Sequence, residues 1–92
     1  RNEMIYKKPM FIGTLNANLV HPREIFQEAL KQNAASVILT HNHPSGDPEP
    51  SEDDLTITKR IVEAGKTMGI DVLDHVIITK NKPFSFKENK LI

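Results

Sequence analysis

Cysteine is absent from this sequence of 92 residues, which excludes disulfide bonds and thiolate metal ligands. No apolar run reaches the length of a membrane span and no signal peptide is recognisable, which favours a cytoplasmic protein. Twelve basic residues balance twelve acidic ones, so net charge gives no general attraction to nucleic acid or to an anionic membrane. Because there is no cysteine, any metal site must use histidines and carboxylates.

The length allows one domain with a small hydrophobic core. The first residue is Arg1 rather than methionine, so we expect a segment of a longer chain. We interpret residues 1–92 as a single domain.

Hydrophobic periodicity predicts strands that alternate with helices. The predicted elements are a β-hairpin over residues 3–15 followed by a turn at 16–18, a helix that opens at Pro22, a strand over 36–43, a helix capped by Ser51 and ended by Gly69, a strand over 72–79 and an edge strand over 84–86. This order predicts an α/β fold in which two helices pack on a mixed sheet.

The sequence predicts where the first helix begins and which residues of this helix and of the next strand are buried. Proline suits the first helical position, because its missing N–H would be unpaired there. Four apolar residues at helical spacing are predicted to face the core: Ile25, Phe26, Ala29 and Leu30. The unbroken run Val37-Ile38-Leu39 predicts a strand buried on both faces, and hence a central place in the sheet.

The second helix shows a similar pattern. Five residues repeat at helical spacing: Leu55, Thr58, Ile61, Val62 and Gly65. A glycine within a helix costs roughly 1 kcal/mol relative to alanine, so we expect close packing at Gly65. Gly69 is the C-terminal stop.

The segment between the central strand and the second helix holds the candidate functional site. His41 and His43 are two residues apart in extended backbone, so their side chains point to the same side. Asp54 lies in the first turn of the next helix, where its carboxylate can turn back toward the strand. Two imidazoles and a carboxylate form a three-ligand site with an open fourth position, which a catalytic zinc requires.

Each part of this segment also has an explanation without metal. Two histidines at this spacing can be ordinary surface residues. Ser51 can cap the helix, and the acidic residues of its first turn complement the helix dipole. The joint spacing, together with the resemblance described next, favours the metal interpretation.

The order His-x-His, seven residues, Ser, two residues, Asp resembles the metal signature of the JAMM (MPN+) metalloproteases. Four residues match it position for position: His41, His43, Ser51 and Asp54. The sequence of residues 41–48, His-Asn-His-Pro-Ser-Gly-Asp-Pro, is similar to that of the RadC branch of that superfamily. Further blocks agree at residues 13–16, 21–24, 64–65 and 74–77, so the resemblance covers most of the chain.

The resemblance implies a cytidine-deaminase-like (JAB/MPN) fold and zinc-dependent hydrolysis of amide or isopeptide bonds. His41, His43 and Asp54 would hold Zn²⁺, and Ser51 would donate a hydrogen bond to the oxyanion that forms. A glutamate on an early strand is the general base in that family, and a helix-hairpin-helix segment often precedes the domain. We expect the first strand and that segment to be missing from residues 1–92.

None of the three upstream glutamates matches the motif of the general base. Glu3 is too near the start of the chain, Glu24 lies in the first turn of a helix, and Glu28 lies within that helix. We therefore assign no base and expect this chain by itself to be a poor catalyst.

Two further histidines have plain structural interpretations. His21 precedes Pro22 and is most simply a neighbour of the helix N-cap. His75 lies on the face of its strand opposite Val76, and we interpret it as a core imidazole hydrogen-bonded to backbone. A ligand or catalytic role is the alternative for each.

Three functions compete. The first is a zinc metallohydrolase acting on a peptide or isopeptide substrate. The second is a DNA-repair-associated module, because the RadC name is tied to DNA repair, although there is no basic patch and five carboxylates lie within residues 47–54. The third is a non-catalytic metal-binding interaction module. We expect no membrane partner and only weak, salt-sensitive binding of duplex DNA by this domain alone, and a homo-oligomer is left open.

Overall fold

The computed structural model describes residues 9–15, 21–43 and 46–92. Its elements are β1 (Met10–Leu15), α1 (Pro22–Lys31), β2 (Ser36–Asn42), α2 (Glu52–Met68), β3 (Asp71–Ile78) and β4 (Phe84–Ser85). The predicted α/β fold with a mixed sheet and two helices is confirmed, consistent with a JAB/MPN fold. The first run of the predicted hairpin and the turn at residues 16–18 lie outside the described residues. Neither of these helices has the length and apolar character that a membrane crossing requires.

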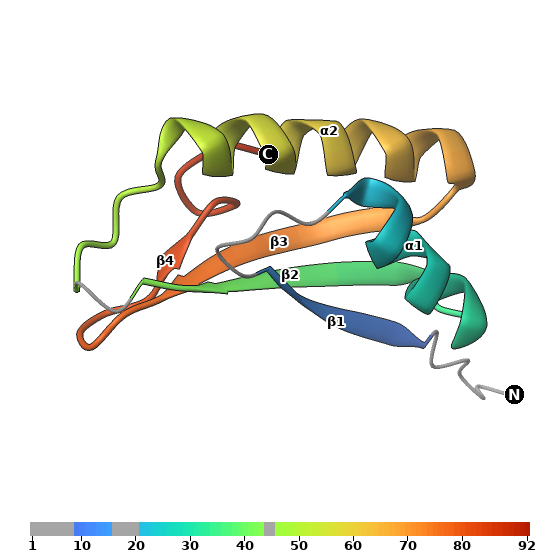
Figure 1. Cartoon of the computed structure of the whole chain (residues 1–92), viewed down its shortest axis with the longest axis horizontal. Coiled ribbons are helices and arrows are strands. Elements are labelled where there is room, and N and C mark those ends of the chain that lie inside the picture. The colour runs from blue at the N-terminus through green and yellow to red at the C-terminus, as the bar shows by residue number, and fades with distance from the viewer. Residues whose placement is uncertain (1–8, 16–20, 44–45) are drawn as a thin grey trace, which may run out of the picture.

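The four strands form one sheet in the order β1-β2-β3-β4. β1 and β3 each pair in parallel with β2, and β4 pairs antiparallel with β3. Parallel neighbours need crossover connections, which α1 and α2 supply. The C-terminal ends of β2 and β3 therefore lie side by side at the same end of the sheet, near the start of α2 (Figure 1).

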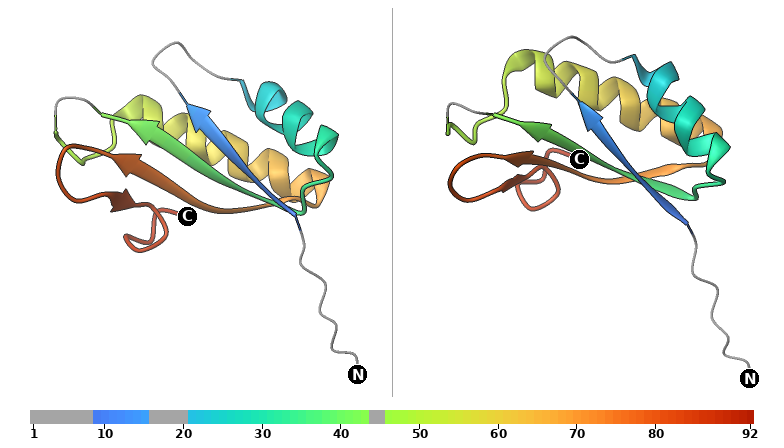
Figure 2. Two further views of the ribbon diagram at one scale, coloured as in Figure 1. Left: turned by 90° about the horizontal axis from the view of Figure 1, so that it is seen from below. Right: turned by 60° about the horizontal axis from the view of Figure 1, so that its bottom comes forward.

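Both helices cover the same face of the sheet (Figure 2). On that face Val37 and Leu39 of β2 are fully buried and join the core with Phe26 and Ile61. Ile38 points to the other face and is only partly buried. The central place of β2 is confirmed, but the prediction that both its faces are buried is wrong, because neither described helix covers the second face.

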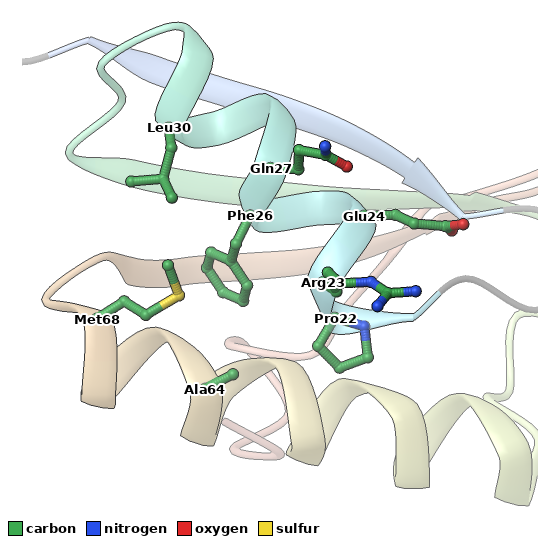
Figure 3. Close-up of a pocket in the computed structure, with 8 residues that line it drawn as sticks. All are labelled: Pro22, Arg23, Glu24, Phe26, Gln27, Leu30, Ala64 and Met68. Atoms are coloured by element: carbon green, nitrogen blue, oxygen red, sulfur yellow. The ribbon is translucent and has the colours of Figure 1, made fainter.

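The first helix begins as predicted, with His21 as the N-cap residue and Pro22 at the first helical position. Three of the four predicted core residues are buried: Ile25, Phe26 and Ala29. The prediction for Leu30 is wrong, because its side chain is 54% exposed. It lies one helical turn beyond Phe26, where a groove separates α1 from α2 and Met68 lines the opposite side (Figure 3).

The second helix has the predicted boundaries: Ser51 is the N-cap residue, and Gly69 ends the helix in the left-handed conformation with φ of 75°. Close packing at Gly65 is confirmed, because a Cβ there would overlap the backbone oxygen of Ile70. Leu55 is 39% exposed, so it does not share the buried face of the helix with Thr58 and Ile61.

The C-terminal segment folds back on the sheet beside β3. The predicted edge strand is confirmed as β4, and the buried Phe86 follows it. The Asp74 carboxylate holds this segment by accepting hydrogen bonds from the Ser85 hydroxyl at 2.7 Å and from the Lys87 backbone N–H at 3.0 Å. This arrangement places the Phe86 ring against the ring of His75 on β3.

Candidate metal centre

The two histidines of the motif lie at the end of β2. His41 is within the strand and pairs with Leu15 of β1 and Ile77 of β3. His43 follows the last strand residue, and its backbone N–H donates to the Ile78 carbonyl at 2.9 Å. The two rings meet edge to face, with their centroids 4.7 Å apart. The prediction that both side chains point to the same side is confirmed.

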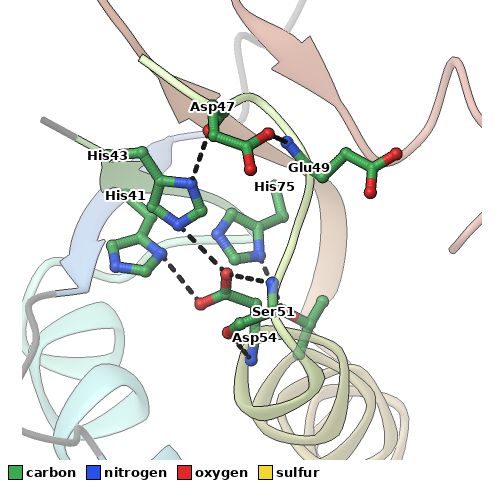
Figure 4. A network of polar contacts seen from close by, with 8 residues as sticks. His41, His43, Asp47, Glu49, Ser51, Asp54 and His75 are labelled. Carbon is green, nitrogen blue, oxygen red and sulfur yellow. Dashed lines mark hydrogen bonds and ion pairs between the residues drawn. The ribbon is translucent and has the colours of Figure 1, made fainter. Parts of the chain in front are cut away.

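Asp54 approaches these rings from the first turn of α2 (Figure 4). Its Oδ1 lies 3.0 Å from His41 Nδ1, and its Oδ2 lies 3.1 Å from His43 Nε2. Oδ2 also accepts a hydrogen bond from the Ser51 backbone N–H at 2.8 Å, and the Asp54 N–H donates to Ser51 Oγ at 3.1 Å. The capping box and the contact with the histidines therefore use the same carboxylate.

The ring nitrogens of the two histidines are in different surroundings. His43 Nδ1 lies 3.0 Å from the Asp47 carbonyl oxygen, which can only accept, and Nε2 lies 3.1 Å from Asp54 Oδ2; in the neutral ring the hydrogen is then on Nδ1, and Nε2 is the nitrogen that a metal can bind. His41 Nδ1 is buried and makes no hydrogen bond within the described chain, because its short contact with Asp54 lacks hydrogen-bond geometry. Both nitrogens that face Asp54 are thus suited to bind a cation.

The three side chains bring possible ligand atoms together. Zinc binds imidazole nitrogen and carboxylate oxygen at about 2.0–2.2 Å. One atom from each side chain lies within 4.8 Å of the others, and each imidazole nitrogen faces a different oxygen of Asp54, at 3.0 and 3.1 Å. His41, His43 and Asp54 could therefore hold a metal ion.

Opposing effects act on the pKa of Asp54, which is 5% exposed. Burial favours the protonated acid and would raise its pKa. The hydrogen bond from the Ser51 backbone and the charge of nearby His41 favour the carboxylate, and together they keep the pKa below its ordinary value. The ionised form, which binds cations, is therefore present at neutral pH.

His75 of β3 lies beside this group and is fully buried. Its Nδ1 is 2.6 Å from the Thr58 hydroxyl, and its ring stacks on Phe86 with centroids 4.3 Å apart. The predicted core position is confirmed, but the predicted hydrogen bond to backbone is wrong, because the ring points toward α2 and meets the Thr58 side chain. Burial, and to a lesser extent the nearby His41, lower the pKa of His75 to about 4, so the ring is uncharged at neutral pH.

The other candidates lie away from this group. His21 caps α1 without a side-chain hydrogen bond. Glu24 lines the groove between the helices, and Glu28 pairs with Lys31 at 3.4 Å on the exposed side of α1. Glu3 lies outside the described residues.

The sequence did not predict three groups that contact His43 or His75 in the structure. The first is the Asp47 carbonyl, and no pattern predicts a backbone oxygen as the partner of His43. The second is Thr58, four residues after Asp54 and so on the same side of α2, a spacing that could have indicated it. The third is Phe86, at the end of the alternating Phe84-Ser85-Phe86 run.

Comparisons with known proteins agree on one family. A family model described as RadC-like JAB domain matches residues 1–91. A UPF0758 protein of Geobacillus kaustophilus is 58% identical over 88 residues, which cover 96% of this chain and 39% of that protein. A UPF0758 protein of Clostridium botulinum is 58% identical over 92 residues, which cover 100% of this chain and 40% of that protein. The chain thus spans about two-fifths of the length of these relatives.

Proposed function

Because this chain belongs to the RadC-like JAB domain family, we propose that it is the zinc-binding hydrolase domain of a protein that cleaves amide or isopeptide bonds. The observation that carries the proposal is the convergence of His41, His43 and Asp54, whose ligand atoms lie within 4.8 Å of one another. The donor set of two imidazoles and one carboxylate is typical of catalytic zinc, which keeps a position open for water or substrate.

The surrounding groups support this assignment. The Asp47 carbonyl orients the His43 ring so that Nε2 faces the other ligands. The Ser51 backbone N–H orients the Asp54 carboxylate. When bound, zinc supplies an activated water at neutral pH and polarises a carbonyl group.

Ser51 is the proposed hydrogen-bond donor to the substrate carbonyl oxygen as negative charge develops there. Its Oγ accepts the hydrogen bond that caps α2, from the Asp54 N–H at 3.1 Å. A hydroxyl group can accept and donate at once, so its hydrogen remains available for substrate. The capping role and the catalytic role are therefore compatible.

The general base is proposed to come from a part of the longer protein outside the described residues. Glu24 and Glu28 are on α1, and the contacts described for them involve the interhelical groove and Lys31. General acid–base assistance is typically worth about 10²–10⁴-fold in rate. We therefore expect this chain by itself to bind zinc and to cleave amides barely above background.

Zinc binding is tested by elemental analysis of protein purified without chelator. We expect one zinc per chain, and loss of zinc in the His41→Ala, His43→Ala double variant. His21→Ala is the matched control and should keep zinc, because this histidine caps α1. Full zinc occupancy in the double variant would overturn the assignment.

Catalysis is tested with a full-length relative and this chain side by side. A cleavable substrate is first found by screening peptides and isopeptides with the longer protein. We expect strong hydrolysis by the longer protein only. If a strand before the matched segment of that protein carries a glutamate, changing this glutamate to glutamine should abolish the hydrolysis. Equal hydrolysis by the two proteins would place the base within residues 1–92, and Glu24→Gln and Glu28→Gln would then be the variants to compare.

The expectations about the substrate, nucleic-acid binding and cellular location of this protein stay predictions. They are a peptide or isopeptide substrate, only weak, salt-sensitive binding of duplex DNA by this domain alone, and a cytoplasmic location. The DNA-repair-associated and non-catalytic alternatives have no specific support in the described contacts.

A further inference from the structure

A second buried nitrogen beside the metal centre has no role assigned so far. Two buried side-chain nitrogens lack a hydrogen-bond partner among the described residues: His41 Nδ1 and His75 Nε2. The first faces Asp54, as a metal ligand would. Buried polar atoms in native proteins nearly always have a partner, and a phenylalanine would fill this core position without an unpaired nitrogen. Packing alone therefore does not account for a histidine at position 75.

The sheet register places His75 next to the ligand residues. His75 pairs with Leu39, and His41 pairs with Ile77, so the two histidines are diagonal neighbours on the helix-covered face of the sheet. Their ring centroids are 6.2 Å apart. With Nδ1 bonded to Thr58, the ring turns its other nitrogen toward the ligand histidines (Figure 4).

Two buried residues fix this orientation. Thr58 is 2% exposed, and its hydroxyl is 2.6 Å from His75 Nδ1. Phe86 is 1% exposed, and its ring stacks on the imidazole with an interplanar angle of 13°. Thr58 lies one helical turn after Asp54, so a single hydrogen bond joins the imidazole on β3 to the helix that carries the third ligand.

We propose that His75 is a positioning residue of the metal centre: Thr58 and Phe86 lock its ring against His41, and this keeps the two ligand histidines aligned with Asp54. The inference rests on the proposed zinc site and extends it. His75 makes no contact with substrate in this role, and it acts through the ligands. Residues that orient metal ligands from outside typically change metal affinity by about 10–100-fold when they are altered.

The test measures zinc affinity by competition with a chelator, and the visible spectrum of the cobalt-loaded protein. Thr58→Val keeps the shape of the side chain and removes the hydroxyl, so we expect zinc affinity to fall about 10-fold or more. The cobalt spectrum should change with it, and Thr58→Ser should restore both. Thr67→Val is the matched control, because its exposed hydroxyl donates to the Glu63 backbone oxygen of its own helix.

A second variant keeps the inference testable if Thr58→Val does not fold. Phe86→Leu removes the ring that stacks on His75. Phe84→Leu is its control, because it shortens a neighbouring phenylalanine in the same way and the ring contact described for Phe84 is edge-on with Phe86. Unchanged zinc affinity and an unchanged cobalt spectrum in a folded Thr58→Val or Phe86→Leu variant would overturn the inference and leave His75 a core residue only. Absence of zinc binding by the unaltered chain would refute the proposed function itself.

Discussion

Acid should destabilise the metal-free fold through His75 in a defined pH window. The folded protein holds this ring uncharged, because burial lowers its pKa from 6.5 to about 4. In the unfolded chain the ring takes up a proton as the pH falls below about 6.5. Between these two values the unfolded state binds more protons, so the free energy of unfolding decreases as pH falls. Below about pH 4 both states are protonated and the loss stops growing.

The magnitude follows from the two pKa values. The difference between 6.5 and about 4 corresponds to about 3 kcal/mol, at about 1.4 kcal/mol for each pH unit. Of the charged groups around the ring, His41 of β2 and His43, which follows that strand, disfavour its protonation, and Asp54 and Asp74 favour it. These groups titrate too, so the contribution of His75 must be isolated by comparison with a variant.

His75→Phe is the variant that isolates it, because an aromatic ring can keep the stack on Phe86. Urea denaturation with chelator present gives the free energy of unfolding of both proteins across the window. The lost hydrogen bond to Thr58 gives an offset that does not depend on pH. We expect the stability difference, unaltered chain minus variant, to decrease by about 3 kcal/mol from neutral pH to about pH 4. Parallel stability curves over this range would refute the reasoning.

Two further substitutions test the packing and the cap of α2. Gly65→Ala should lower the free energy of unfolding by about 1–3 kcal/mol, because the added methyl overlaps the Ile70 backbone oxygen and outweighs the gain in helix propensity; a higher melting temperature than that of the unaltered chain would contradict this, with Lys66→Ala as the exposed control. Ser51→Ala should cost about 1 kcal/mol of stability through the lost cap. In the full-length relative, the equivalent substitution should lower amide hydrolysis about 10²–10³-fold while zinc stays bound, and unchanged hydrolysis would remove Ser51 from the proposed mechanism.

Local rules determined much of this protein from the sequence. Alternation along an extended strand brings His41 and His43 to one side, whatever the rest of the fold does. The spacing of Ser51 and Asp54 specifies a capping box, which turns the carboxylate back toward the strand end. Gly69 ends α2 because glycine adopts a positive φ readily. These features depend on backbone geometry over a few residues, so a sequence pattern suffices to predict them.

Only the tertiary structure decided which faces are covered and which distant groups meet. Leu30 and Ile38 lie in apolar patterns, yet Leu30 borders the groove beside α2, and Ile38 lies on the sheet face that neither described helix covers (Figure 2). The hydrogen bond between Thr58 and His75 joins residues 17 positions apart, and its existence depends on how α2 crosses β3. The hydrophobic pattern of a sequence indicates which face of a helix or strand is apolar. It does not say how the helices and strands pack against one another, and this packing decides which side chains meet.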